Sequence, residues 1–244
     1  MTRRGRAGKV VVFAKVPMEG RVKTRMSPPL SPRQAADLYG AMLGDVLEAT
    51  VRFAESLLLE PVLALHPGSA CAEWAHRVPP GYRVIAQRGG SLAERMANAV
   101  DDEAGPGGGP ILLRGSDSPA LPGKRLEAAL LALEDHDIVL SPDRDGGYSL
   151  IGLGGAWPGL FAVPTSTGHV LTDTLSRAEA LGARVALIEG GFDLDRIEDL
   201  SALRAVAEGP EAGLCARTLA YLEREQIWPP GFKPGAGPGG RAGN

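Results

Sequence analysis

Short apolar runs alternate with longer amphipathic segments along most of the chain. The apolar runs are rich in β-branched residues, which is typical of buried parallel strands, and the clearest span residues 9–16, 82–87 and 137–142. The amphipathic segments keep apolar side chains on one face at helical spacing, and the first of them follows the N-cap pair Ser31 and Pro32. This alternation predicts an α/β fold, an α/β/α sandwich with a mostly parallel central sheet.

Local signals complete the predicted topology. Pro61 demotes the first half of a strand at residues 57–67 to an edge or a bulge. The segment from Ser91 to Glu94 is a capping-box sequence that opens a helix ending near residue 103. Further helices are expected at residues 126–134, 170–181, 197–208 and 212–225.

The chain is predicted to hold one domain, residues 9–228. A basic tail at residues 1–8 precedes it, and a Pro/Gly-rich tail at residues 229–244, expected to be disordered, follows it. Ligands of such sheets bind outside the carboxyl ends of the strands, so the loops at those ends are the first candidates for chemistry.

The loop after the first strand, AKVPMEGRVKTRM, carries the cations Lys15, Arg21, Lys23 and Arg25. These side chains repel one another unless they are solvated or face an anion. Phosphate is the natural anion, because ammonium and guanidinium groups give it charge-assisted hydrogen bonds and Gly20 allows backbone N–H groups to approach. The spacing is not that of a Walker loop, and a solvated surface turn is the alternative.

The fourth strand ends on GSDSP, which places Asp117 directly after an apolar run. A bare buried carboxylate is costly, so this acid must be solvated, hydrogen-bonded or bound to a metal. Mg²⁺ or Mn²⁺ suits one or two carboxylates together with phosphate oxygens. The structural alternative is that Asp117 caps the helix that begins near Pro122.

Two later segments also carry candidate residues. In SPDRDGGYSLIGL the local pattern favours a plain turn between strands, and the functional alternative is a flexible lip in which Gly146, Gly147 and Tyr148 line the acceptor pocket and Asp145 acts as general base. In GFDLDRIEDL either Asp193 or Asp195 is expected to cap the following helix, and Asp195 is a candidate second ligand to a metal on Asp117.

Charge and cysteine content exclude several functional classes. The chain has 244 residues, a net charge of -3 and a pI near 5.9, which argues against a nucleic-acid-binding protein. Two distant cysteines and four scattered histidines give neither a disulfide framework nor a zinc site. The apolar runs are too short for a membrane span, and the N-terminus does not have the pattern of a signal peptide, so we expect a cytoplasmic protein.

Four motifs in order, FAKVPMEGRVKTRM, GSDSPAL, SPDRDGGYSLIGL and DLDRIEDL, resemble a bacterial family of uncharacterised glycosyltransferase-like proteins (DUF2064), some of them linked to arsenosugar biosynthesis. That family lies in the nucleotide-diphospho-sugar transferase superfamily. The resemblance implies a glycosyltransferase A fold, a metal on Asp117, phosphate contacts from Lys23 and Arg25, and Asp195 as the later acid. The chain departs from the family pattern at Ser91, where relatives often have an acid, and at Thr165, where they often have Trp.

Three functions are therefore considered. The first is a metal-dependent glycosyltransferase, with a nucleotide sugar as donor, a small-molecule acceptor and Mg²⁺ or Mn²⁺ as cofactor. The second is a nucleotidyltransferase that joins a nucleoside triphosphate to a small phosphorylated or hydroxylated metabolite and releases pyrophosphate. The third is a catalytically impaired nucleotide-binding protein. The family resemblance favours the first narrowly, whereas the many cations of the first loop favour the second.

Overall fold

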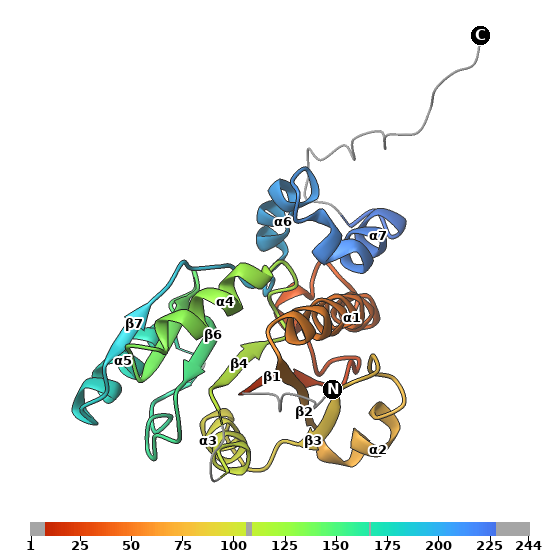
Figure 1. The fold of residues 1–244 in the computed structure, drawn as a ribbon. Coiled ribbons are helices and arrows are strands. Elements are labelled where there is room, and N and C mark those ends of the chain that lie inside the picture. The colour runs from red at the N-terminus through yellow and green to blue at the C-terminus, as the bar shows by residue number, and fades with distance from the viewer. Residues whose placement is uncertain (1–7, 106–108, 166, 228–244) are drawn as a thin grey trace.

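The computed structural model describes residues 8–105, 109–165 and 167–227 (Figure 1). Its strands are β1 (Gly8–Lys15), β2 (Leu59–His66), β3 (Arg83–Ala86), β4 (Ile111–Gly115), β5 (Ile138–Pro142), β6 (Tyr148–Leu153) and β7 (Val185–Leu187). They form one seven-stranded sheet in the order β3-β2-β1-β4-β6-β5-β7. The predicted terminal tails lie outside the described residues, apart from Gly8.

Strand direction decides which loops meet. β1 is parallel to β2 and β4, β2 is parallel to β3, and β5 is parallel to β7. β6 is antiparallel to both neighbours, β4 and β5, so it alone among the seven described strands runs in the opposite direction. The segments after β1, β3, β4, β5 and β7 therefore all lie at one edge of the sheet.

Helices cover both faces of the sheet, as Figure 1 shows. The α-helices are α1 (Pro32–Ser56), α2 (Cys71–Trp74), α3 (Leu92–Glu103), α4 (Gly123–Ala132), α5 (Val170–Ala180), α6 (Leu200–Ala207) and α7 (Ala216–Arg224). Alternate β1 residues point to opposite faces: Val11 packs in a cluster with residues of α3 and α5, whereas Val10 and Val12 pack with residues of α1 and α4. The predicted α/β/α sandwich with a mostly parallel sheet is confirmed.

The predicted helix starts are confirmed at two places. The Ser31 hydroxyl accepts a hydrogen bond from the backbone N–H of Gln34 at the start of α1, and the Gln34 side chain accepts one from the backbone N–H of Ser31. Ser91 and Glu94 form the same reciprocal box at the start of α3. Each box satisfies backbone N–H groups that the first turn of a helix leaves unpaired.

Pro61 lies in a part of β2 that has no neighbouring strand on one side, so the missing backbone N–H leaves no ladder hydrogen bond unmade on that side. The register of β2 runs from Leu59 against β1, but β3 joins β2 only from Val62 onward. The first half of β2 therefore behaves as an edge, as its proline predicts. None of the described helices is both long and apolar enough to span a bilayer.

Candidate active site

A cleft of about 700 Å³ opens at the sheet edge where the loops meet. Its wall contains the four predicted cations and the three predicted site acids: Lys15, Arg21, Lys23, Arg25, Asp117, Asp145 and Asp195. The first two cations form no ion pair with any described carboxylate. The basic loop and the acid after β4 thus share one cleft, although they are distant in sequence.

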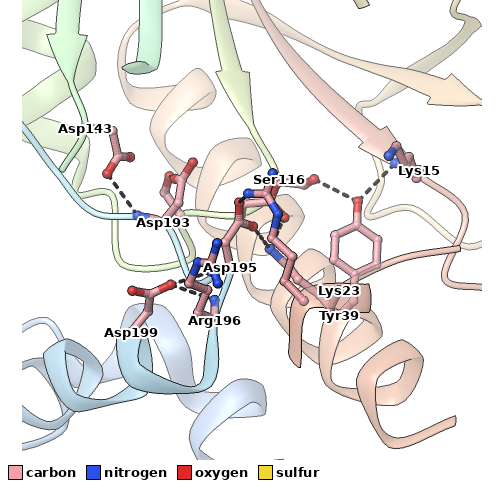
Figure 2. A network of polar contacts seen from close by, with 12 residues as sticks. Lys15, Lys23, Tyr39, Ser116, Asp143, Asp193, Asp195, Arg196 and Asp199 are labelled. Atoms are coloured by element: carbon pink, nitrogen blue, oxygen red, sulfur yellow. Dashed lines mark hydrogen bonds and ion pairs between the residues drawn. The ribbon is translucent and has the colours of Figure 1, made fainter. Parts of the chain in front are cut away.

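Lys23 lies between the two acids. Its Nζ is 2.5 Å from Oδ1 of Asp117 and 2.7 Å from Oδ1 of Asp195 (Figure 2). Only 4% of the Lys23 side chain is exposed, against 38% for Asp117 and 34% for Asp195. Burial alone would lower the pKa of Lys23, but the two carboxylates raise it above its ordinary value. The cleft therefore holds a buried, charged ammonium beside two partly exposed carboxylates.

The backbone of Lys23 is left-handed, with φ 47° and ψ 36°, at the N-cap of a short 3-10 helix (Thr24–Met26). Such a conformation is uncommon outside glycine and costs about 1 kcal/mol. Met26, the last residue of that short helix, is fully buried against α1 and α6. The packed helix and the two ion pairs together hold Lys23 in this conformation.

Asp117 does not cap α4. The N-cap of that helix is Pro122, and no side chain bonds its first turn. The alternative interpretation of Asp117 as a cap is therefore wrong. Its loop is held instead from inside the core, where the buried Arg114 donates to the carbonyl of Ser118 at 2.8 Å and to the hydroxyl of Thr50 at 2.9 Å. Burial lowers the pKa of Arg114 to about 10.

The segment after β7 supplies Asp195. The expectation that Asp193 or Asp195 caps the next helix is wrong, because Asp199 accepts the backbone N–H groups of Asp195 and Arg196 at 2.9 and 2.7 Å. This leaves the carboxylate of Asp195 for Lys23 and for Arg25, whose guanidinium lies 3.6 Å away. Burial opposes ionisation of Asp195, but Lys23 outweighs it and the pKa of Asp195 is lowered.

Tyr39 joins the ends of β1 and β4 and was not a predicted site residue. Its hydroxyl accepts the backbone N–H of Lys15 at 3.0 Å and lies 2.7 Å from Oγ of Ser116 (Figure 2). The Lys23 ammonium lies 5.9 Å from its ring centroid. Burial and the nearby Asp117 raise the pKa of Tyr39 to about 12, so the hydroxyl stays neutral. The periodicity of α1 marks the position as core, and only its hydroxyl signals a polar role.

A second carboxyl pair lies beside the first. The backbone N–H of Asp193 donates to Oδ1 of Asp143 at 3.2 Å, and the Ser118 hydroxyl donates to Asp193. Burial and the charges of Asp117 and Asp143 raise the pKa of Asp193 well above its ordinary value. Burial also raises the pKa of Asp143. A shared proton therefore suits this pair.

The DGG segment forms the hairpin between β5 and β6, as the local pattern favours. Asp145, Gly147 and Tyr148 line the cleft, and Oδ1 of Asp145 accepts the N–H of Gly147 at 2.9 Å. Gly146 (φ 86°) is not in the cleft wall; it packs against the backbone of Gly168. The hairpin is thus both a turn and one wall of the cleft.

Three other residues that the sequence singled out lie at different places. Gly20 has φ 68°, no atom lies within 4 Å of the position that a Cβ would take, and the residue is not in the cleft wall. Thr165, one of the two departures from the family pattern, lines the cleft. Ser91, the other departure, is the N-cap of α3. The cleft also contains Arg95 of α3, which was not predicted and whose buried Nε has no hydrogen-bond partner among the described residues.

The donor set for a metal consists of two carboxylates. Within the described ranges no three His, Cys, Asp or Glu side chains gather as a metal-binding group. Asp117 and Asp195 both face the cleft, each partly exposed, and both approach the same ammonium. Mg²⁺ in nucleotide enzymes takes one or two carboxylates and completes its shell with water and phosphate oxygens. The two residues fit that requirement.

Known proteins resemble this chain in sequence. Residues 50–167 match the family described as "Uncharacterized protein conserved in bacteria (DUF2064)". The 3-phospho-D-glycerate guanylyltransferase of Phenylobacterium zucineum strain HLK1 is 32% identical over 208 residues, which cover 82% of this chain and 91% of that protein. The 2-phospho-L-lactate guanylyltransferase of Methanopyrus kandleri strain AV19 is 31% identical over 194 residues, which cover 78% and 87%.

The fold of this chain resembles that of a solved structure over most of both chains. It is a protein of Desulfovibrio desulfuricans G20 assigned as a nucleotide-diphospho-sugar transferase, with a TM-score of 0.75 and 25% sequence identity. The match covers 89% of this chain and 97% of that one. Sequence and fold thus point to the same superfamily.

Proposed function

Because the chain is a transferase of the DUF2064 family, in the nucleotide-diphospho-sugar transferase superfamily, and two of its relatives are guanylyltransferases, we propose that it transfers a nucleotidyl group. An oxygen of a small phosphorylated acid attacks the α-phosphorus of a nucleoside triphosphate, with GTP as the first candidate. The bond from that phosphorus to the bridging oxygen breaks, and pyrophosphate leaves. The names of the relatives support this alternative better than glycosyl transfer from a nucleotide sugar.

One observation carries the proposal: the basic loop and the acids after β4 and β7 line one cleft and meet at Lys23. A nucleoside triphosphate and the departing pyrophosphate carry more charge than the diphosphate of a nucleotide sugar. Lys15 and Arg21 reach the same cleft without a carboxylate partner among the described residues. Such cations are suited to a triphosphate tail.

Each polar group of the cleft has a role in this proposal. Asp117 and Asp195 hold Mg²⁺ or Mn²⁺, which when bound neutralises phosphate charge. Lys23 keeps the two carboxylates together and offers its remaining N–H to a phosphate oxygen. The Tyr39 hydroxyl stays neutral and fixes the position of Lys15 by accepting the backbone N–H of that residue. The protein thereby presents organised charge before the substrate arrives.

The acceptor is assigned to the side of the hairpin. Asp145, Gly147 and Tyr148 line that part of the cleft wall, together with Thr165. In this assignment Asp145 receives the proton when the attacking group is a hydroxyl, and Gly146 holds the hairpin against Gly168. A phosphorylated hydroxy acid is the acceptor class, by analogy with the relatives. A nucleoside triphosphate substrate also agrees with the cytoplasmic location expected from the sequence.

The test is pyrophosphate release. The purified protein is mixed with GTP, Mg²⁺ or Mn²⁺, and either 3-phospho-D-glycerate or 2-phospho-L-lactate, with EDTA and Asp117→Asn as controls. We expect release that needs both the acceptor and the metal and that Asp117→Asn abolishes without loss of fold. Release of a nucleoside diphosphate from a nucleotide sugar would instead establish the glycosyltransferase. No turnover of either kind, with nucleotide still bound, would establish the impaired nucleotide-binding protein.

A further inference from the structure

The cleft contains a glutamine side chain whose orientation is fixed by its neighbours. Gln87 follows β3, and its Nε2 donates to the carbonyl of Ala64 at 2.8 Å and to that of Ala14 at 2.9 Å. Carbonyl oxygens only accept hydrogen bonds, so the amide nitrogen must be the atom that faces them. Both of its hydrogens are used. The planar amide therefore offers only the acceptor Oε1 to a ligand.

Gln87 also has a defined place relative to the phosphate side of the cleft. Its partner Ala14 precedes Lys15 in β1, and the backbone N–H of Gln87 donates to the carbonyl of Leu65 in β2 at 3.0 Å. It lines the same cleft as the basic loop. A group bound against Gln87 is therefore a close neighbour of phosphates bound at that loop, which is the relationship of a nucleoside to its own phosphates.

The surroundings of Gln87 suit the flat face of a base. The first two turns of α3 add Leu92, Ala93 and Met96 to the cleft wall. Leu92 is 37% exposed, so its side chain is accessible to a ligand in the cleft. Apolar side chains with a small number of precisely placed polar atoms are typical of ligand pockets. The hairpin wall, with Asp145 and Tyr148, leaves separate room for the acceptor.

We propose that Gln87 is a specificity-determining residue that reads the base of the bound nucleotide through Oε1. An acceptor held without a donor beside it requires an N–H on the base edge and repels a carbonyl or a ring-nitrogen acceptor. Guanine offers two adjacent donors, N1–H and the 2-amino group, whereas the amino groups of adenine and cytosine each lie beside a ring-nitrogen acceptor and uracil flanks its one N–H with two carbonyls. The base favoured is therefore guanine. This inference deepens the proposed function and rests on it for the presence of a nucleotide.

The test compares Gln87→Met with a matched control, Asn98→Leu. Asn98 of α3 also donates its amide to a backbone carbonyl, that of Arg88 at 2.7 Å, but it is not in the cleft wall. Both variants lose an amide-to-backbone hydrogen bond near the same loop, and only Gln87→Met loses the acceptor in the cleft. Dissociation constants are measured for GTP, ITP, ATP, CTP and UTP, and for inorganic tripolyphosphate as a ligand without a base.

We expect the wild-type protein and Asn98→Leu to prefer GTP, and Gln87→Met to lose about tenfold of that preference while its tripolyphosphate affinity stays unchanged. Equal weakening of all ligands, tripolyphosphate included, would overturn the proposal, because Gln87 would then only stabilise the strand ends. Absence of base preference in the wild-type protein would overturn it as well. Because the readout is binding, base preference without pyrophosphate release separates failure of the proposed reaction from failure of this inference.

Discussion

The ammonium of Lys23 lies 2.5 Å from Asp117 Oδ1, at the meeting point of the loop that leaves β1 and the loop that leaves β4. The two strands are parallel neighbours, so their carboxyl ends place these residues side by side. Asp195 approaches the same ammonium from the segment after β7. One buried cation thus links three separate loops.

Replacing that cation tests its role in catalysis. We expect Lys23→Met to lower kcat/KM for pyrophosphate release by at least about 100-fold, because the charge facing the phosphates is lost and two carboxylates are left to repel each other. The matched control is Arg33→Met, which removes a cation that is 79% exposed and 3.9 Å from Asp37 on the surface of α1. Steady-state kinetics of both variants decide the matter. A Lys23→Met enzyme within a few-fold of wild type would contradict this role.

Tyr39 gives a prediction that separates stability from positioning. We expect Tyr39→Phe to lose about 1 kcal/mol of unfolding free energy and also to reduce kcat about tenfold, since the backbone of Lys15 and the hydroxyl of Ser116 lose their partner. Tyr82→Phe removes a comparable hydroxyl, which donates to the carbonyl of Leu47 at 3.1 Å outside the cleft wall. Urea denaturation should show similar losses for both, and only Tyr39→Phe should slow turnover. Equal turnover in the two variants would argue against the positioning role.

Much of the cleft follows from the parallel direction of most strands, which the sequence pattern predicts. Lys23 lies in the loop that follows the first strand and Asp117 comes directly after the fourth, and parallel strands place such segments at one edge of a sheet. The DGG turn likewise predicts the hairpin that carries Asp145. These are local signals combined with one topological rule, and they were sufficient for the main residues.

Other parts of the site depend on contacts that no local pattern encodes. Tyr39 lies on the apolar face of α1, and only the packing of that helix brings its hydroxyl to Ser116. Gln87 bonds carbonyl groups on two different strands, so its fixed orientation requires the finished sheet. Asp199 replaces the two nearer acids as the partner of the backbone before α6 because the segment bends before the helix begins.

The buried acid pair predicts a dependence of stability on pH. Burial and the neighbouring Asp117 and Asp143 raise the pKa of Asp193, so the folded state holds its proton more tightly than the unfolded state. The stability from this proton is complete below pH 4, the ordinary range of aspartate, and is lost as the pH rises through the folded pKa. Asn at this position cannot ionise. We therefore expect the free energy of unfolding of Asp193→Asn, relative to that of the wild-type protein, to increase by at least about 1 kcal/mol between pH 4 and 8.

Urea denaturation at a series of pH values measures that difference. Asp137→Asn is the control of opposite sign, because hydrogen bonds from Arg184 lower the pKa of Asp137. The stabilising effect of the Asp137 carboxylate is present above the ordinary pKa of aspartate and is lost as the pH falls. The free energy of unfolding of Asp137→Asn should therefore decrease relative to that of the wild-type protein as the pH rises. A difference between Asp193→Asn and wild type that stays constant with pH would mean that folding does not raise the pKa of Asp193.

Gly146 links the hairpin of the acceptor side to the segment before α5. An added Cβ would clash with the carbonyl oxygen of Gly168, and the φ of 86° is itself unfavourable for alanine. We expect Gly146→Ala to lose about 1 kcal/mol for the backbone conformation and about 2 kcal/mol more for the clash. Gly182→Ala is the matched control, since Gly182 has φ 73° and no atom within 4 Å of the added Cβ. Thermal and urea unfolding should show the smaller loss for Gly182→Ala. Because the hairpin must move to relieve the clash, Gly146→Ala should also raise KM for the acceptor while leaving KM for GTP within about twofold; an equal rise in both would place the acceptor elsewhere in the cleft.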